Sequence, residues 1–134
     1  MELKEMRILV VEDNSAARNL LKNILTDVGI HQIFTAGDGR EAQEFLDEAH
    51  DEIDLILCDW RMPRMTGLEL LQQVRTVFPE MPFIMITANA DIDSVKAAMN
   101  YGVNAYISKP YSAQELEKKM KMIAFQLSMS AAKD

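Results

Sequence analysis

The chain has few of the features that anchor or cross-link small proteins. Its 134 residues include a single cysteine, Cys58, so no disulfide can form within it. No apolar run approaches the roughly 18 residues that a membrane-spanning helix needs, and we find no secretory signal. We therefore expect neither a membrane protein nor a disulfide framework, and both absences fit a reducing cytoplasm.

Basic side chains are also fewer than acidic ones. Lys and Arg number 14 against 21 Asp and Glu, and this formal net charge of −7 argues against non-specific binding to nucleic acid. The imbalance lies in residues 1–59, which carry 14 acidic and 5 basic side chains, whereas residues 60–134 carry 7 and 9. If the chain binds a polar protein partner, we therefore expect the binding surface in residues 60–134, where charges of both signs are present.

Short apolar runs alternate with helical patterns along the whole chain. With 49% hydrophobic and 26% charged residues, we expect residues 1–134 to form a single domain. Runs rich in β-branched residues predict buried strands at 6–11, 32–36, 55–59, 83–87 and 105–108. Helical patterns predict helices at about 15–28, 68–77 and 91–101, and from 112 onward, and a further helix that follows a turn at 37–39 and includes residues 42–49. Five βα units in succession indicate an α/β fold, in which a parallel sheet carries helices on both faces.

Local signals mark where several of these helices begin and end. Ser15 is expected to cap the first helix, which Gly29 ends and whose apolar stripe includes Leu20. Ser112 and Glu115 have the spacing of a capping box at the start of the last helix.

Carboxylates follow two of the predicted strands at the point where each strand ends. Glu12 and Asp13 come after the first run, and Asp59 ends the third. Ligands of an open parallel sheet bind outside the carboxyl ends of its strands, so we expect these three carboxylates at one edge. There they would repel one another unless a cation lies among them, and Mg²⁺ prefers oxygen ligands of this kind. Alternatively, Glu12 and Asp13 bind no metal, and their negative charges only stabilise the N-terminus of the following helix.

Phosphoryl transfer is the chemistry that this set of side chains suits. A carboxylate such as Asp59 can form an acyl phosphate if the negative charge of the phosphoryl group is screened. Lys109 supplies a positive charge at the end of the fifth run, and Thr87 a hydroxyl at the end of the fourth. Taken alone, Thr87 would be an ordinary strand threonine.

These motifs together resemble the receiver domain of two-component response regulators. The residues that carry the resemblance span about residues 6–127 and are Glu12-Asp13, Asp59, Met62-Pro63, Gly67, Thr87-Ala88 and Lys109-Pro110. The resemblance, strongest to single-domain chemotaxis regulators, implies a doubly wound, flavodoxin-like (βα)5 sheet with strand order 2-1-3-4-5. It implies Mg²⁺, with Mn²⁺ as a substitute, and phosphorylation of Asp59 by a sensor histidine kinase or a phosphotransfer protein.

The same resemblance assigns further roles. It makes the chain a phosphoacceptor signalling domain rather than an enzyme, and the backbone carbonyl of Arg61 a metal ligand. It predicts a cis bond between Lys109 and Pro110, and it makes Tyr106 a switch that is buried when Thr87 moves toward the phosphoryl group. A static, half-buried tyrosine is the alternative. Arg61 and Asn89 stand where receivers tune the lifetime of the acyl phosphate.

Three other functions are weighed against this one. A haloacid-dehalogenase-type phosphatase also uses an aspartyl nucleophile, but it needs a second aspartate two residues on, where this chain has Arg61. A nucleotide- or flavin-binding module would have a glycine- or hydroxyl-rich loop after the first strand, whereas Glu12 and Asp13 repel phosphate. An interaction-only receiver that has lost its chemistry is disfavoured by the full set of acidic residues, Thr87 and Lys109.

The last helix has two apolar stripes. Its core stripe consists of Leu116, Met120, Ile123, Ala124 and Leu127. At about 100° per residue, Met122, Phe125 and Met129 fall on nearly the opposite face. With Tyr106, these three are the candidate surface for a downstream protein, a second copy in a weak homodimer, or a following output domain. The alternative is fraying of the helix or exposure without consequence.

Overall fold

The computed structural model describes residues 1–88 and 91–133, and only the backbone of 131–133. The strands are β1 (Arg7–Val11), β2 (Gln32–Ala36), β3 (Leu55–Cys58), β4 (Phe83–Thr87) and β5 (Ala105–Ser108). The α-helices are α1 (Ser15–Asp27), α2 (Gly39–Ala49), α3 (Gly67–Val77), α4 (Ile92–Asn100) and α5 (Ala113–Lys133). The predicted order of elements is confirmed, with boundaries that shift by one or two residues.

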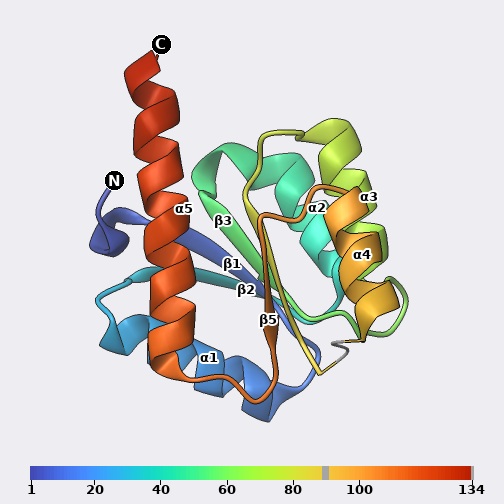
Figure 1. Cartoon of the computed structure of the whole chain (residues 1–134). Coiled ribbons are helices and arrows are strands. Elements are labelled where there is room, and N and C mark those ends of the chain that lie inside the picture. The colour runs from blue at the N-terminus through green and yellow to red at the C-terminus, as the bar shows by residue number, and fades with distance from the viewer. Residues whose placement is uncertain (89–90, 134) are drawn as a thin grey trace.

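The five strands form one parallel sheet in the order β2-β1-β3-β4-β5. Helices α1 and α5 cover one face of this sheet, and α2, α3 and α4 cover the other (Figure 1). The prediction of a doubly wound α/β sheet with strand order 2-1-3-4-5 is therefore confirmed. All five strands end at the same edge, the lower one in Figure 1, and this edge carries the candidate site.

Alternation along the strands divides the core into two layers. In β1, Ile8 and Val10 pack toward α1 and α5, whereas Leu9 and Val11 pack toward α2 and α3. Successive side chains of a strand point to opposite faces, so a strand that is covered on both sides is apolar throughout. This is why the runs read as continuous apolar stretches in the sequence.

Three local predictions need correction. Asn14 rather than Ser15 caps α1, because its side chain accepts a hydrogen bond from the Ala17 N–H at 2.9 Å. Leu20 was expected in the inward stripe of α1, but it is 56% exposed. Asp59 was placed in the third strand, but β3 ends at Cys58 and Asp59 begins the loop that follows.

The start of α5 matches its prediction in part. The Ser112 hydroxyl accepts a hydrogen bond from the Glu115 N–H at 3.1 Å, as a capping residue should. The Glu115 carboxylate contacts the Ser112 hydroxyl at 3.4 Å rather than completing the reciprocal bond to the backbone.

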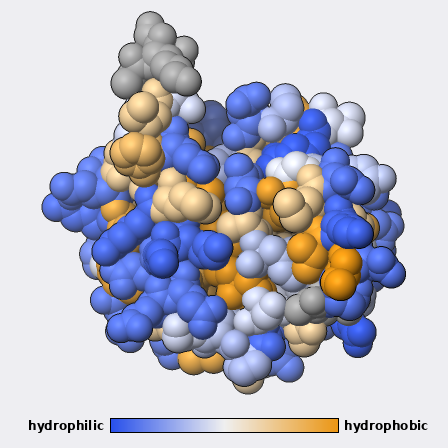
Figure 2. All heavy atoms as spheres, in the orientation of Figure 1, coloured by the Kyte–Doolittle hydropathy of each residue, from blue (hydrophilic) through white to orange (hydrophobic). Residues whose placement is uncertain are grey.

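The two faces of α5 are confirmed. Its core stripe packs against the sheet, and Met122, Phe125 and Met129 are exposed. The helix projects past the sheet, and Figure 2 shows apolar atoms along this projecting half and hydrophilic atoms along the first half. Across the described parts of the chain, no helix is both long and apolar enough to cross a bilayer.

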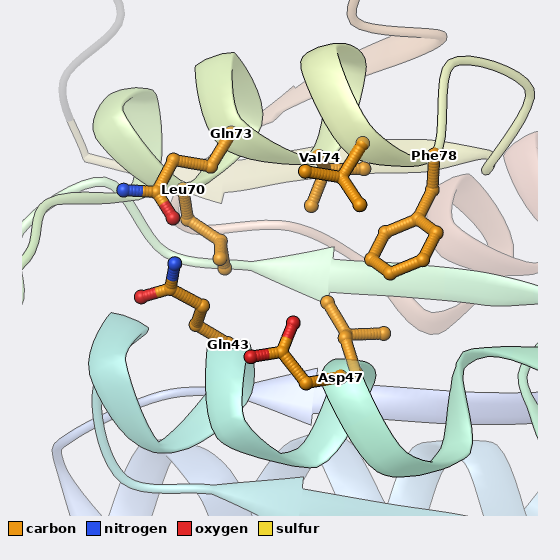
Figure 3. A pocket seen from close by; sticks show the side chains of 8 residues that line it. Gln43, Asp47, Leu70, Gln73, Val74 and Phe78 are labelled. Carbon is orange, nitrogen blue, oxygen red and sulfur yellow. The ribbon is translucent and has the colours of Figure 1, made fainter.

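A small cavity lies between α2 and α3, away from the acidic edge. Gln43 and Asp47 of α2 face Leu70, Gln73, Val74 and Phe78 across it (Figure 3). Its volume is about 20 Å³, enough for roughly one water molecule. The Gln73 side-chain oxygen is buried there without a hydrogen-bond partner, so a single bridging water is the occupant that the cavity suits.

Candidate functional site

Three carboxylates converge where β1 and β3 end. One oxygen each from Glu12, Asp13 and Asp59 lies within 4.8 Å of the other two. Glu12 is buried, Asp59 is partly buried and Asp13 is exposed, so the cluster opens toward solvent on the Asp13 side. The convergence that the strand ends predicted is therefore confirmed by the geometry.

Lys109, which follows β5, is the counter-charge within this cluster. Its ammonium donates to Glu12 Oε1 at 2.8 Å and to Asp59 Oδ2 at 3.3 Å. Burial raises the pKa of Glu12, and repulsion from Asp59 adds to this although the Lys109 hydrogen bond opposes it. Burial alone would lower the pKa of Lys109, but its carboxylate partners raise it. Lysine therefore stays charged, and one ammonium among three carboxylates leaves a formal charge of −2.

This arrangement fits a divalent cation. Around an octahedral Mg²⁺, adjacent ligand oxygens lie about 3 Å apart and opposite ones about 4.2 Å apart. Oxygens within 4.8 Å of one another can share one ion if the carboxylates draw together around it. The remaining formal charge of −2 equals the charge that such an ion neutralises. The donors are all hard oxygens, the ligand type that Mg²⁺ and Mn²⁺ prefer.

The Asp59 carboxylate is held at one oxygen more firmly than at the other. Its Oδ1 accepts the Trp60 N–H at 2.7 Å, whereas Oδ2 has the longer contact with Lys109. The Asp59 N–H donates to the Val11 carbonyl at 3.0 Å, which ties the residue to the end of β1. Oδ2 is therefore the oxygen that faces the ammonium and is the better placed to take a phosphoryl group.

Thr87 and Tyr106 lie on the neighbouring strands. Thr87 is buried at the end of β4, where its carbonyl accepts the Lys109 N–H at 2.9 Å. Tyr106 of β5 is half-buried. Burial raises its pKa, and the charges of Asp91 and Asp59 raise it further. The switching role of Tyr106 stays a prediction.

The loop between β3 and α3 forms one wall of the site. Arg61 is exposed, and with Asp13, Trp60, Met62 and Thr66 it lines an open hollow of about 450 Å³. Thr66 is the N-cap of α3 and forms a reciprocal capping box with Glu69. The cis Lys109–Pro110 bond is confirmed. Asn89, the other residue expected to tune the lifetime, lies outside the described residues.

Sequence reasoning missed two features that shape this loop. A Cβ on Gly67 would lie 2.2 Å from the Asp59 carbonyl oxygen, so the loop returns directly against the backbone of Asp59. Arg64 forms an ion pair with Asp38, which precedes α2. The Asp-Gly pair at 38–39 signals a helix cap, but nothing near Arg64 in the sequence indicates a partner 26 residues away.

Fold and site together define a class of protein: a phosphoacceptor signalling domain with an acidic cation site at the carboxyl edge of a parallel sheet. The family model described as "Response regulator receiver domain" matches residues 8–121. The chain belongs to this family. It is thus a receiver domain of a two-component system, a switch activated by phosphorylation rather than a conventional enzyme, and receivers bind Mg²⁺ in an acidic pocket of this kind.

Similar proteins agree with this assignment. The chain is 40% identical over 120 residues to "Chemotaxis protein CheY1" of Helicobacter pylori, covering 88% of this chain and 96% of that protein. It is 39% identical over 120 residues to "Chemotaxis protein CheY" of Pseudomonas aeruginosa, covering 88% and 95%. Among solved structures, the CheX–CheY–BeF3–Mg complex of Borrelia burgdorferi matches with a TM-score of 0.84 at 27% identity, covering 88% of each chain.

Proposed function

We propose that Asp59 is the phosphoacceptor and that its donor is the phosphohistidine of a sensor histidine kinase or a phosphotransfer protein. The carrying observation is the Lys109 ammonium that links Asp59 to buried Glu12 at the open acidic edge. In the transfer, Asp59 Oδ2 forms a bond to phosphorus while the phosphorus–nitrogen bond breaks. The electron pair of that bond returns to the imidazole. No proton is needed on Asp59, because it attacks as the carboxylate.

Charge neutralisation is the main task of the surrounding residues. Phosphoryl transfer depends more on positioning and electrostatics than on covalent help from the protein. We propose that the Lys109 ammonium contacts the oxygens of the phosphoryl group during the transfer, and that the Thr87 hydroxyl donates a hydrogen bond to one of them. Asp13, Asp59 and the backbone carbonyl of Arg61 are the proposed direct ligands of Mg²⁺, and Glu12 is a direct or water-bridged one. When bound, the ion screens the charge of the phosphoryl group.

Removing the metal tests this proposal directly. With phosphoramidate and millimolar Mg²⁺, the intact mass of the chain is expected to rise by one phosphoryl group. Excess EDTA should abolish the rise, and Mn²⁺ should restore it, because both ions take the same oxygen ligands. Labelling that is equally fast in EDTA would contradict the metal-assisted mechanism.

We further propose that phosphorylation changes the face formed by α4, β5 and α5. The support is that β5, which carries half-buried Tyr106, pairs with β4, which ends at Thr87, and that α5 carries exposed Met122, Phe125 and Met129. Added charge at Asp59 would bias the position of Tyr106 and with it the packing around β5. The downstream partner is proposed to bind there, and the names of the relatives make chemotaxis the pathway to test first.

Phe125 offers a test of the exposed stripe. We propose that the stripe pairs weakly with a second copy, because Phe125 is 66% exposed between two exposed methionines. The sedimentation coefficient of the unaltered chain is expected to rise with concentration. Phe125→Asp is expected to abolish this rise while leaving phosphorylation of Asp59 intact. Val77→Asp on α3 is the matched control, because Val77 is also exposed, at 60%, but lies on another face. Unchanged association in Phe125→Asp would show that the stripe is merely exposed.

A further inference from the structure

The two oxygens of the Asp38 carboxylate have separate partners. Oδ1 accepts the Glu41 N–H at 2.8 Å and so caps α2. Oδ2 accepts from Arg64, whose Nε lies at 2.9 Å and whose Nη2 also donates to it. The carboxylate is 9% exposed, and its hydrogen bonds with Glu41 and Arg64 lower its pKa. It is therefore charged at neutral pH and joins the start of α2 to the β3–α3 loop.

Arg64 adopts a backbone conformation that this ion pair helps to maintain. Its φ is +67°, in the left-handed region that residues other than glycine, asparagine and aspartate rarely adopt. Arginine gains nothing from this conformation by itself. This backbone cost therefore falls on the residue whose side chain forms the ion pair at the start of α2.

A steric contact supports the loop beside the ion pair. A Cβ on Gly39, the first residue of α2, would lie 2.8 Å from both the Cβ and the backbone oxygen of Met65. The absence of a side chain at Gly39 therefore lets Met65 rest against the start of α2. Farther along, the Gly67 N–H donates to the Trp60 carbonyl at 2.8 Å, so the loop is held at both of its ends and Arg61 lies between them.

We propose that the Arg64–Asp38 pair is a clamp that positions the β3–α3 loop for divalent-cation binding. Arg64 and Asp38 are positioning residues, since neither belongs to the proposed ligand set. The clamp acts by holding the segment that starts at Asp59 and contains the Arg61 carbonyl. This inference rests on the metal site of the proposed function and adds to it a determinant of affinity.

The clamp and a direct electrostatic effect of the Arg64 charge predict changes of opposite direction in the Kd for Mg²⁺. This difference makes the clamp testable. Arg64→Gln removes a positive charge and leaves the Asp38 carboxylate uncompensated, so electrostatics alone would strengthen Mg²⁺ binding. Loss of the clamp would instead weaken it, because part of the binding free energy must then order the loop. The direction of the change therefore separates the two explanations.

The experiment is a Mg²⁺ titration followed by the fluorescence of Trp60, which lines the hollow beside Asp13. Arg64→Gln is expected to raise the Kd about two- to fivefold, the range in which exposed ion pairs change an equilibrium constant. Arg7→Gln is the matched control. It removes an arginine pair with Asp54, with contacts of 3.2 Å, before β3 and so at the opposite edge of the sheet. It should lower stability comparably and leave the Kd unchanged.

A double-mutant cycle completes the test. Asp38→Asn keeps the Oδ1 cap but loses the ion pair, so it should raise the Kd as Arg64→Gln does. The double variant should show no further increase, because both changes break one interaction. An unchanged or lower Kd in Arg64→Gln, or additive effects in the double variant, would overturn the clamp. The proposed metal site itself would be wrong if Mg²⁺ did not change the Trp60 fluorescence of the unaltered chain, or if Asp13→Asn did not abolish that change.

Discussion

An Asp59→Asn variant is expected to take up no phosphoryl group from phosphoramidate and Mg²⁺ under conditions that label the unaltered chain. An amide lacks the anionic oxygen that attacks phosphorus, and no neighbouring group provides a comparable substitute. Asp13 and Glu12 are close, but Glu12 is buried against Lys109 and Asp13 is exposed to solvent, whereas Asp59 Oδ2 faces the Lys109 ammonium. Intact mass measurement is the readout, and a complete loss of the added phosphoryl mass is the expected result.

This loss should occur without unfolding. The asparagine oxygen can still accept the Trp60 N–H, and the substitution removes one of three mutually repelling carboxylates. Lys109 keeps its shorter contact with Glu12. The thermal midpoint is therefore expected to be equal to or above that of the unaltered chain. Asp27→Asn, the same chemical change at an exposed position of α1, should label normally. A label that persists in Asp59→Asn would place the nucleophile elsewhere.

The residues of the site were predictable because strand ends determine them. The carboxylates, Thr87 and Lys109 lie at or within two residues of the end of an apolar run, and parallel strands bring such positions to one edge. Glu12, Asp13 and Asp59 could thus be grouped from the sequence before any distance was known. The Arg64–Asp38 clamp could not, because it joins two loops that pack side by side only after the sheet has formed. Neither loop has an apolar periodicity from which its path could be read.

The helices show a similar limit at their margins. Leu20 belongs to the helical spacing of α1, yet at 100° per residue it lies about 120° from the direction midway between buried Leu21 and Leu25. Periodicity identifies the stripe but not how wide a surface the sheet covers. The N-cap moved from Ser15 to Asn14 for a related reason: both residues favour the cap, and only the path of the preceding loop decides between them.

Gly67→Ala is expected to destabilise the fold by about 1–3 kcal/mol or more, the cost of forcing an extra group into a filled space. Local propensity points the other way, since alanine in place of glycine in a helix adds up to about 1 kcal/mol of stability. Sterics should prevail, because the new Cβ would lie 2.2 Å from the Asp59 carbonyl oxygen and 3.0 Å from the Trp60 Cα. These are backbone atoms, which cannot rotate away as a side chain can.

The crowded atoms belong to Asp59, the proposed phosphoacceptor, and to Trp60 beside it, so phosphorylation should slow as stability falls. A shift of about 1 Å at a reacting group costs roughly 10²-fold in rate, and phosphorylation of Gly67→Ala is expected to slow by a factor of that order. Gly37→Ala is the matched control, because its nearest neighbour is the end of the Glu41 side chain at 3.2 Å, which can rotate aside, rather than a backbone atom. Its unfolding free energy should change by no more than about 0.5 kcal/mol. If Gly67→Ala melts and labels like Gly37→Ala, the β3–α3 loop has room to move away from Asp59, and its close return is not what fixes the position of the phosphoacceptor.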